Sequence, residues 1–199
     1  MTRCWWVLGT WLLATSPALA QTPGASTDRT IGASVSAASL WDDETHLGRG
    51  AAVALDGWTP LGPHARVGVE GGWLAHRRDA GYLAADGHAL HLMGRGLWQL
   101  GPRQWRTRPF VGGGLGVARS TGTLTTRDPL ALPFERDQSW RLTRLAWELH
   151  LGVRTALGDR WTLRPELRAG AIGGTRRAGA IQPPLVRLQA GVAVEWAPR

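Results

Sequence analysis

The chemistry-bearing side chains of this sequence are arginines, glutamates and histidines that recur at alternate positions. In one segment, Glu148 precedes His150 by two residues, and Arg154 follows. Side chains two residues apart lie on the same face of a β-strand, so Glu148 and His150 have the spacing of an acid/base pair. No serine or cysteine nucleophile joins them on that strand. A structural histidine inside the protein is therefore the preferred interpretation.

Charged side chains of both signs form the largest candidate set. They would share the inner face of a closed sheet, where eight strands leave an interior just wide enough for side chains. Because an isolated buried charge is strongly unfavourable, we expect Arg–Glu pairs to plug this lumen. Arginine outnumbers glutamate, so a narrow, anion-favouring pore is the alternative. The lumen set comprises Arg66, Glu70, Arg95, Arg108, Arg144, Glu148, His150, Arg154, Arg164, Glu166, Arg168, Arg187 and Glu195.

Eight segments of alternating apolar and polar residues must position these side chains. One face of each carries mainly Leu, Val, Ala and Trp, whereas the other carries Arg, Glu, His and Gly. An amphipathic helix would instead repeat every 3.6 residues. The sequence thus predicts an all-β fold, an eight-stranded antiparallel up-and-down transmembrane β-barrel within residues 30–197. The expected strands are 30–40, 49–58, 66–76, 87–100, 107–119, 140–157, 160–172 and 185–196.

The connections between these segments alternate in length. Tight connections rich in Gly, Pro and Asp follow the second, fourth and sixth segments, and mostly longer ones follow the first, third, fifth and seventh. Short turns on one rim and long loops on the other, with an even strand count, are typical of outer-membrane barrels. Tryptophans near the strand ends predict two aromatic girdles. Trp58, Trp98, Trp161 and Trp196 would line the short-turn rim, and Trp41, Trp73 and Trp140 the opposite rim.

Residues 1–20 predict a cleaved export signal. Arg3 supplies a positive charge, an apolar run of roughly ten residues follows, and Ala18-Leu19-Ala20 offers the small-x-small cleavage pattern. The run is too short to cross a bilayer as a helix, which takes about 20 residues. Residues 21–29 then form a short N-terminal segment. The single cysteine, Cys4, would be removed with the signal.

Composition excludes some functions. The formal net charge is +8 at pH 7, but the arginines are spread along alternating strands and are not clustered with stacking aromatics, so nucleic acid is not an expected partner. His88 and His91 are three residues apart, hence on opposite faces of a strand, which is poor geometry for a metal. We expect no metal and no cofactor. The glycine-rich run 112–116 continues the alternation of a strand, unlike a phosphate-binding loop that opens a helix.

A soluble barrel of the lipocalin or avidin type, exported to the periplasm, is the structural rival. Its apolar face would point inward, with the same alternation. Three features favour the membrane version. Gly and Ala dilute the charged face, as a narrow lumen requires. Trp lies at strand ends, where a membrane has its polar interface. Strands of about 10 to 13 residues match a tilted membrane crossing.

Two segments carry a family resemblance. Residues 108–118, RPFVGGGLGVA, and residues 163–168, LRPELR, resemble strand motifs of small Gram-negative outer-membrane barrels of the OmpA/OmpX and porin type. The resemblance covers most of residues 30–197 by pattern, and it implies an outer-membrane location.

The same fold class includes lipid A deacylases, which implies an enzymatic alternative. Such enzymes need His and Ser close together on a strand, and Ser34 and Ser36 have no histidine beside them.

The sequence therefore predicts a monomeric outer-membrane barrel with a structural or surface-interaction role and no catalytic activity. A narrow passive channel is the first alternative, and a lipid A-modifying enzyme is the second. The expected partners are outer-membrane lipid, lipopolysaccharide and, through the loops, an extracellular partner. Arginine pairs with phosphate in bidentate geometry, and basic loop residues occur at Arg77-Arg78-Asp79, in residues 127–137 and at Arg176-Arg177.

Overall fold

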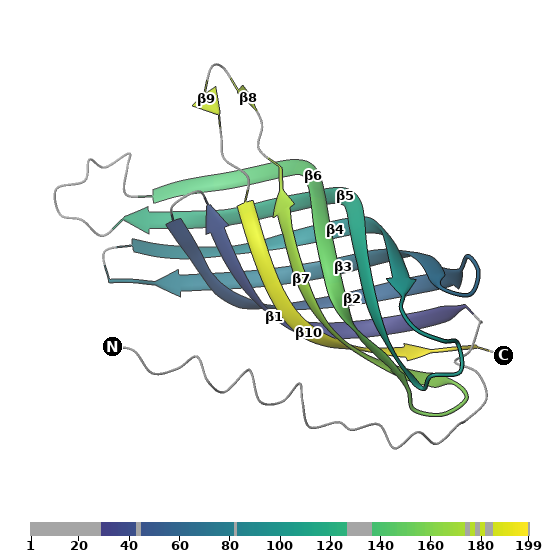
Figure 1. Ribbon diagram of the computed structural model, residues 1–199. Coiled ribbons are helices and arrows are strands. Elements are labelled where there is room, and N and C mark those ends of the chain that lie inside the picture. Colours follow the sequence, from purple (N-terminus) through teal and green to yellow (C-terminus); the bar gives the residue numbers. More distant parts are fainter. Residues whose placement is uncertain are drawn as a thin grey trace.

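The structure is a closed antiparallel barrel of eight strands (Figure 1). The computed structural model describes residues 29–42, 45–81, 83–126, 137–173, 176–177, 180–181 and 185–198. The export signal expected over residues 1–20 lies outside these described residues. Within them, no helix is long and apolar enough to cross a membrane. The predicted fold class, an eight-stranded antiparallel β-barrel, is confirmed.

Eight long strands form the wall, and two very short ones pair in the connection before the last of them. Each long strand pairs with its neighbours along the chain, and β1 closes the barrel against β10, with Ile31 opposite Trp196. The strands are β1 (Thr30–Asp42), β2 (Thr45–Pro60), β3 (Ala65–Asp79), β4 (Leu83–Gln99), β5 (Thr107–Thr126), β6 (Asp137–Ala156), β7 (Trp161–Ile172), β8 (Arg176–Arg177), β9 (Ala180–Ile181) and β10 (Leu185–Trp196).

Tight turns at one end of the barrel occur where they were predicted. Residues 61–64, 100–106 and 157–160 join β2 to β3, β4 to β5 and β6 to β7, and we call this the turn end. Gly101 and Gly158 lie in these turns at φ values of 83° and 148°, a region that side chains rarely tolerate. Both the start of β1 and the end of β10 lie at the turn end as well.

The opposite end, which we call the loop end, differs from the prediction. β1 ends at Asp42 and β2 begins at Thr45, while β3 ends at Asp79 and β4 begins at Leu83, so the first and third connections are short. The prediction of longer connections is wrong for the first and third because the strands continue, whereas the fifth, between Thr126 and Asp137, and the seventh, between Ile172 and Leu185, are longer. β5 and β6 each reach 20 residues. Hydrogen bonding between strands does not require an apolar face, so the ladder extends past the hydropathy pattern.

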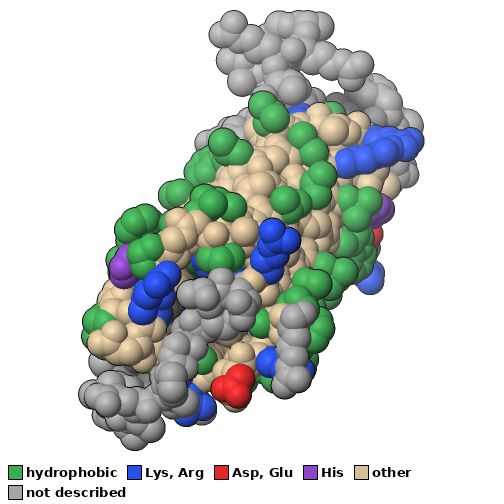
Figure 2. Space-filling view, turned by 90° about the vertical axis from the view of Figure 1, so that its right-hand side faces the viewer, with side chains coloured by type: hydrophobic (Ala, Val, Ile, Leu, Met, Phe, Trp, Pro, Cys, Tyr) green, Lys and Arg blue, Asp and Glu red, His purple; other side chains and the backbone are tan. Residues whose placement is uncertain are grey.

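The outer wall of the barrel is apolar over most of its height. Large hydrophobic side chains alternate along every long strand and point away from the interior, and Figure 2 shows them spread over the surface. Leu145 is 77% exposed and Leu115 is 74% exposed. A monomeric soluble protein rarely exposes a continuous apolar surface of this kind.

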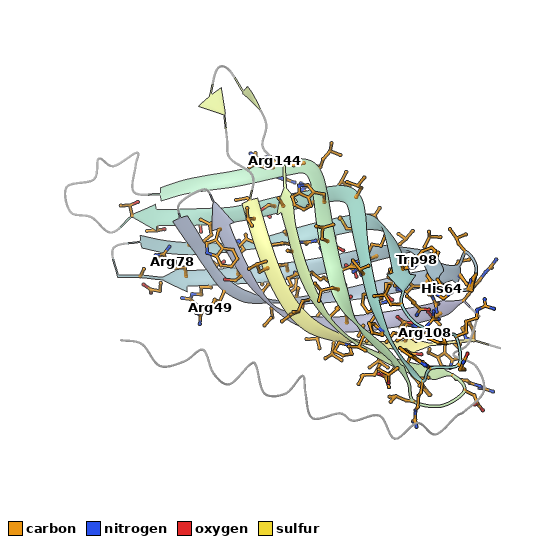
Figure 3. All side chains as sticks on the ribbon, viewed as in Figure 1. Arg49, His64, Arg78, Trp98, Arg108 and Arg144 are labelled. Atoms are coloured by element: carbon orange, nitrogen blue, oxygen red, sulfur yellow. The ribbon has the colours of Figure 1, made fainter. Side chains whose placement is uncertain are left out.

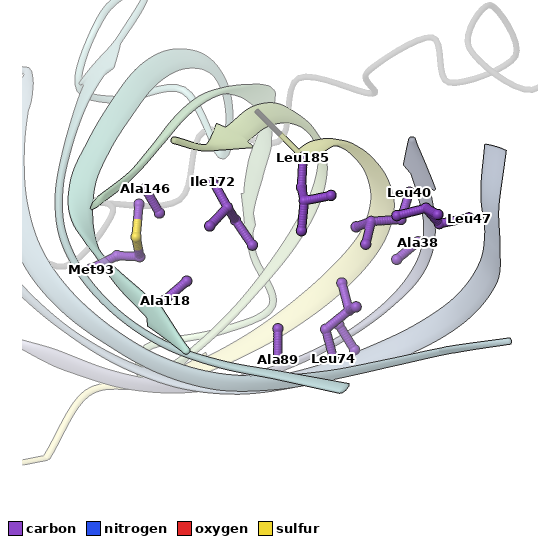
Figure 4. Packing of buried hydrophobic residues seen from close by; sticks show 11 residues of the cluster. Ala38, Leu40, Leu47, Leu74, Ala89, Met93, Ala118, Ala146, Ile172 and Leu185 are labelled. Carbon is purple, nitrogen blue, oxygen red and sulfur yellow. The ribbon is translucent and has the colours of Figure 1, made fainter. Parts of the chain in front are cut away.

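Most ion pairs of the inner wall lie between the turn end and the middle of the barrel. Most apolar side chains lie toward the loop end, where Arg144 and His76 are also buried. An apolar cluster lines the loop end of the interior (Figure 4). Leu74, which breaks the alternation of β3, is 1% exposed within it. A second, smaller apolar cluster of Trp58, Leu97 and Phe110 lies toward the turn end. The loop-end cluster contains Ala38, Leu40, Leu47, Ala52, Leu74, Ala89, Met93, Ala118, Ala146, Ile172 and Leu185.

Candidate functional site

The structure buries every residue of the predicted lumen set. Each of these residues is at most 7% exposed. Along the strands they alternate with outward-facing residues, most of them apolar. They come from β3, β4, β5, β6, β7 and β10, so the barrel wall itself brings them together. The candidate site is therefore the interior of the barrel.

Glu70 is the carboxylate that joins opposite sides of the barrel. Its Oε2 accepts from Arg95 Nη1 at 2.5 Å, and its Oε1 accepts from Arg168 Nη1 at 2.7 Å. β3 and β7, which carry Glu70 and Arg168, are separated by three strands in either direction around the barrel. His91 Nε2 lies 3.1 Å from the same Oε1. The Glu70 carboxylate thus contacts two side chains of the neighbouring strand β4 and one of β7 on the opposite side of the lumen.

Arg95 connects this cluster to two further carboxylates. Its Nε lies 2.8 Å from Glu148 Oε1, and its Nη2 lies 3.5 Å from Glu166 Oε2. Glu148 also accepts from Arg187 Nη2 at 2.5 Å, and Glu166 accepts from Arg168. A planar guanidinium presents five donors in a fixed fork, and this fork allows a single arginine to link Glu70, Glu148 and Glu166.

A second group of ion pairs lies around Glu195 on β10. Arg164 Nη1 donates to Glu195 Oε1 at 2.6 Å and also pairs with Asp56, while Arg154 Nη2 lies 2.8 Å from Glu195 Oε2. Thr30 then donates to Glu195 at 3.2 Å and accepts from Arg66 Nη2 at 2.9 Å. These contacts fasten the first strand to the last from inside the barrel.

Trp58 does not belong to the girdle in which it was predicted. It is 2% exposed and lies inside the barrel, with the guanidinium carbons of Arg95 and Arg164 at 5.4 Å and 5.0 Å from its ring. The reason is the two-residue period of β2, because Trp58 follows Asp56 by two residues and must share its inward face. The ring links the two groups of ion pairs through cation–π contacts.

Four of the other predicted girdle residues lie on the outer wall. Trp73, Trp98, Trp161 and Trp196 are between 36% and 54% exposed, and Trp161 pairs across the strands with Trp196. Trp41 is half-buried, and the side chain of Trp140 lies outside the described part of the structure.

His150 is held by contacts on both ring nitrogens. Its Nε2 lies 3.1 Å from the carbonyl oxygen of Gly96 and therefore donates, whereas its Nδ1 lies 2.5 Å from Arg95 Nη2 and therefore accepts. Glu148 is farther away, with Oε1 at 3.7 Å from Nδ1. With both nitrogens engaged, His150 is arranged as a structural bridge and has no open nitrogen for proton transfer to a substrate.

Arg108 closes the turn end of the interior. It donates to Gln99 Oε1 at 2.8 Å and to the carbonyl oxygen of Pro63 at 3.3 Å, and it contacts His64 Nδ1 at 3.0 Å. The His64 ring stacks on Trp98 at 5.7 Å. Figure 3 shows these three labelled side chains together at one end and Arg49, Arg78 and Arg144 toward the other.

Some interior residues were missing from the predicted set. Asp56, His91 and Thr30 take part in the contacts described above, and Gln99 and Gln189 are also buried. The alternation places Asp56, His91, Gln99 and Gln189 on the polar face of their strands, although the predicted lumen set did not include them. His91 is buried and His88 is exposed, as their spacing predicts. The described residues contain no group of three or more His, Cys, Asp or Glu placed to hold a metal ion.

The sequence itself has no recognisable relative in two comparisons. No protein-family model matches it, and no curated protein matches it significantly. The solved structure of Neisserial surface protein A (NspA) matches with a TM-score of 0.65 at 13% identity, over 85% of this chain and 97% of that chain. The chain has the fold of the small outer-membrane barrels. The resemblance inferred from the strand motifs is thereby confirmed for the fold.

Other barrels of this group match less closely. Ail, the attachment invasion locus protein of Yersinia pestis, solved in complex with the heparin analogue sucrose octasulfate, gives a TM-score of 0.49 at 12% identity, covering 86% of this chain and 99% of Ail. The outer-membrane protein OprG from Pseudomonas aeruginosa also gives 0.49, at 10% identity, covering 88% and 99%. At these identities the likeness concerns the fold alone.

Proposed function

We propose that this protein is an outer-membrane barrel with a structural or surface-interaction role, whose interior is closed to ions and carries no catalysis. The observation that supports it best is the contact of Arg95 with three carboxylates on three other strands. A network of this kind fills the lumen with side chains that hold each other.

The membrane location is supported by the outer wall. Leu, Val and Trp side chains on all long strands are exposed, including Leu55 at 67% and Leu149 at 61%. Each Å² of apolar surface left in water is unfavourable by about 25 cal/mol, so a wall of this composition supports a lipid environment. The soluble rival would need the apolar face inside, whereas the described interior contains the ion pairs.

Two successive layers support the closed interior. Toward the turn end, an ion that enters would have to separate pairs such as Arg164–Glu195, at 2.6 Å. Toward the loop end, it would meet the apolar cluster around Leu74 and Met93, and a hydrophobic constriction excludes ions by dewetting. The excess of arginine favours the channel alternative only if water reaches the charges.

Planar-bilayer recording of the refolded protein tests this closure. We expect no discrete conductance steps from protein that migrates as a folded barrel on an unboiled denaturing gel. The Arg95→Gln variant, which lacks the central guanidinium, separates the two layers. Current in this variant would identify the ion-pair network as the seal, and continued absence of current would show that the apolar cluster is sufficient. Regular steps from the unaltered protein, with anion selectivity, would contradict the proposal and favour the narrow channel.

The lipid-modifying alternative has its own test. Lipid A is isolated from cells with and without the protein and analysed by mass spectrometry. We expect the same acyl composition in both, because His150 has both ring nitrogens engaged. Loss of one acyl chain only in the presence of the protein would favour the enzyme.

A further inference from the structure

The outer wall formed by β4, β5 and β6 changes from apolar to polar at one row of residues near the loop end. Leu92, Val117 and Leu145 lie side by side on the three strands and are all exposed. The next outward row toward the loop end is Leu90, Arg119 and Thr143, and the one after it is His88, Thr121 and Arg141. The apolar belt of this face therefore ends at Arg119.

Arg119 and Arg141 are neighbours on this polar face. Arg119 is opposite Thr143 and Arg141 is opposite Thr121, so the two arginines occupy diagonal positions on adjacent strands. Diagonal neighbours are about 7–8 Å apart between Cα atoms, within reach of long side chains. Both arginines are exposed. Among the described residues, neither guanidinium pairs with a carboxylate.

A shallow, open groove lies at Arg141. It has a volume of about 540 Å³, and its lining includes His88, Thr121 and Arg141. Thr121 Oγ1 and His88 Nε2 are hydrogen-bonded at 2.9 Å across β4 and β5, which fixes both polar groups on the groove floor. Asp86 also lines the groove, but it is one row farther toward the loop end and lies opposite Arg77 on β3. Arg119 lies one outward row from this groove, so Arg119 and Arg141 together outnumber Asp86 on this part of the wall.

This arrangement matches an amphiphilic anion at a membrane surface. An exposed apolar row lies directly below two arginines and two hydrogen-bonding side chains. Guanidinium groups bind phosphate oxygens in bidentate geometry. In the orientation that the proposed function gives the barrel, with the short turns in the periplasm, this row lies at the outer leaflet. The phosphoryl groups of that leaflet belong to lipopolysaccharide.

We propose that Arg119 and Arg141, together with Thr121 and His88, form a binding site on the outer wall for a lipid A phosphate of lipopolysaccharide, whose acyl chains lie along Leu92, Val117 and Leu145. The site rests on the membrane location in the proposed function. It is separate from the interior network and from the basic segments of the connections.

Binding of purified lipid A to the refolded full chain in detergent tests the site. Native mass spectrometry measures the fraction of barrel that retains bisphosphorylated lipid A, its monophosphorylated form, or phosphatidylglycerol. The variant is Arg119→Ala/Arg141→Ala. The matched control is Arg103→Ala/Arg106→Ala, which removes two exposed arginines of the turn end. The gel shift on boiling reports folding of all three proteins.

We expect the Arg119/Arg141 variant to lose affinity for bisphosphorylated lipid A roughly tenfold, as the loss of charge-assisted hydrogen bonds predicts, and the control to bind as the unaltered protein does. The monophosphorylated form should bind more weakly than the bisphosphorylated one. The proposed site would be wrong if the Arg119→Ala/Arg141→Ala variant and the Arg103→Ala/Arg106→Ala control bound bisphosphorylated lipid A with equal affinity. Equal retention of phosphatidylglycerol would overturn the assignment to lipopolysaccharide. Failure of the unaltered protein to fold in detergent would instead refute the membrane location on which the site rests.

Discussion

At the scale of single residues, the closure of the lumen depends on side chains that contact several partners at once. Arg95 contacts Glu70, Glu148 and Glu166 as well as the ring of Trp58. Removing one partner of a buried ion pair lowers stability strongly because the other charge is left buried and unpaired, whereas replacing both partners by apolar residues is often neutral. The interior is therefore sensitive to the loss of one shared residue.

Trp58→Leu tests the residue that links the two groups of ion pairs. We expect the free energy of unfolding to fall by about 2–4 kcal/mol, because a large buried side chain and its two cation–π contacts are lost. The measurement is urea-induced unfolding of the barrel in lipid bilayers. Trp98→Leu, on the exposed outer wall, is the matched control and should have the smaller effect. An equal loss in both variants would contradict the inward position of Trp58.

The sequence could predict which residues face inward but not which of them meet. The alternation correctly predicts that all thirteen members of the lumen set point inward, because the polar face of each strand in a membrane barrel faces the lumen and the apolar face contacts lipid. Asp56 and Arg164 are 108 residues apart, and only the closure of the barrel brings β2 and β7 within reach of each other. At Trp58 the two sequence signals disagree: its position near a strand end predicts a girdle, whereas its spacing of two residues from Asp56 predicts the inward position that the structure shows.

At the scale of strands, the turn end was predictable and the loop end was not. Gly, Pro and Asp mark tight turns by their backbone preferences. Near the loop end, Thr121 and Thr123 continue β5 with polar side chains outside, so hydropathy gives no signal for the strand. Leu74 broke the expected pattern because the interior itself becomes apolar there. Where the interior is apolar, an apolar side chain can face either the lipid or the lumen, so hydropathy alone does not tell which face of the strand points inward.

Glycines on β5 make room for the interior network. A methyl group at Gly112 would overlap the ring of His150 and the carbonyl oxygen of Gly96. Gly112→Ala should therefore destabilise the barrel by about 1–3 kcal/mol in bilayer unfolding, as overpacking does. Gly94→Ala is the control, because the nearest atom to its added methyl is 3.7 Å away. Tolerance of both substitutions would show that His150 can move aside at little expense.

The outward face of β6 provides a test of the membrane boundary. Leu149→Arg places a charge within the apolar belt and should lower stability by about 2–4 kcal/mol, whereas Thr143→Arg, six residues farther toward the loop end on the same face, should be tolerated. Folding efficiency into lipid vesicles measures both. If the two variants behave alike, the boundary at Arg119 is not where the bilayer ends.

At the scale of the whole molecule, the barrel has no exposed strand edge among its eight long strands. Every one of them pairs on both sides, which removes the unpaired edge groups that lipid cannot satisfy. We expect the refolded protein to migrate differently on a denaturing gel when boiled and unboiled. Circular dichroism of the unboiled sample should report β-structure. A protein that is soluble without detergent and shows no shift would favour the periplasmic rival.

The pairing of β1 with β10 has a consequence for how fast the molecule forms. All other wall pairings join strands that are neighbours in the chain, whereas this one brings together residues as distant as Thr30 and Glu195. Closing so long a loop costs conformational entropy. Because folding rates fall as the sequence separation of contacting residues increases, this pairing slows folding. Linking the two ends at the turn end and reopening the chain between β5 and β6 would make the β1–β10 seam local. Such a permuted chain keeps the same wall and the same interior but closes at a different seam.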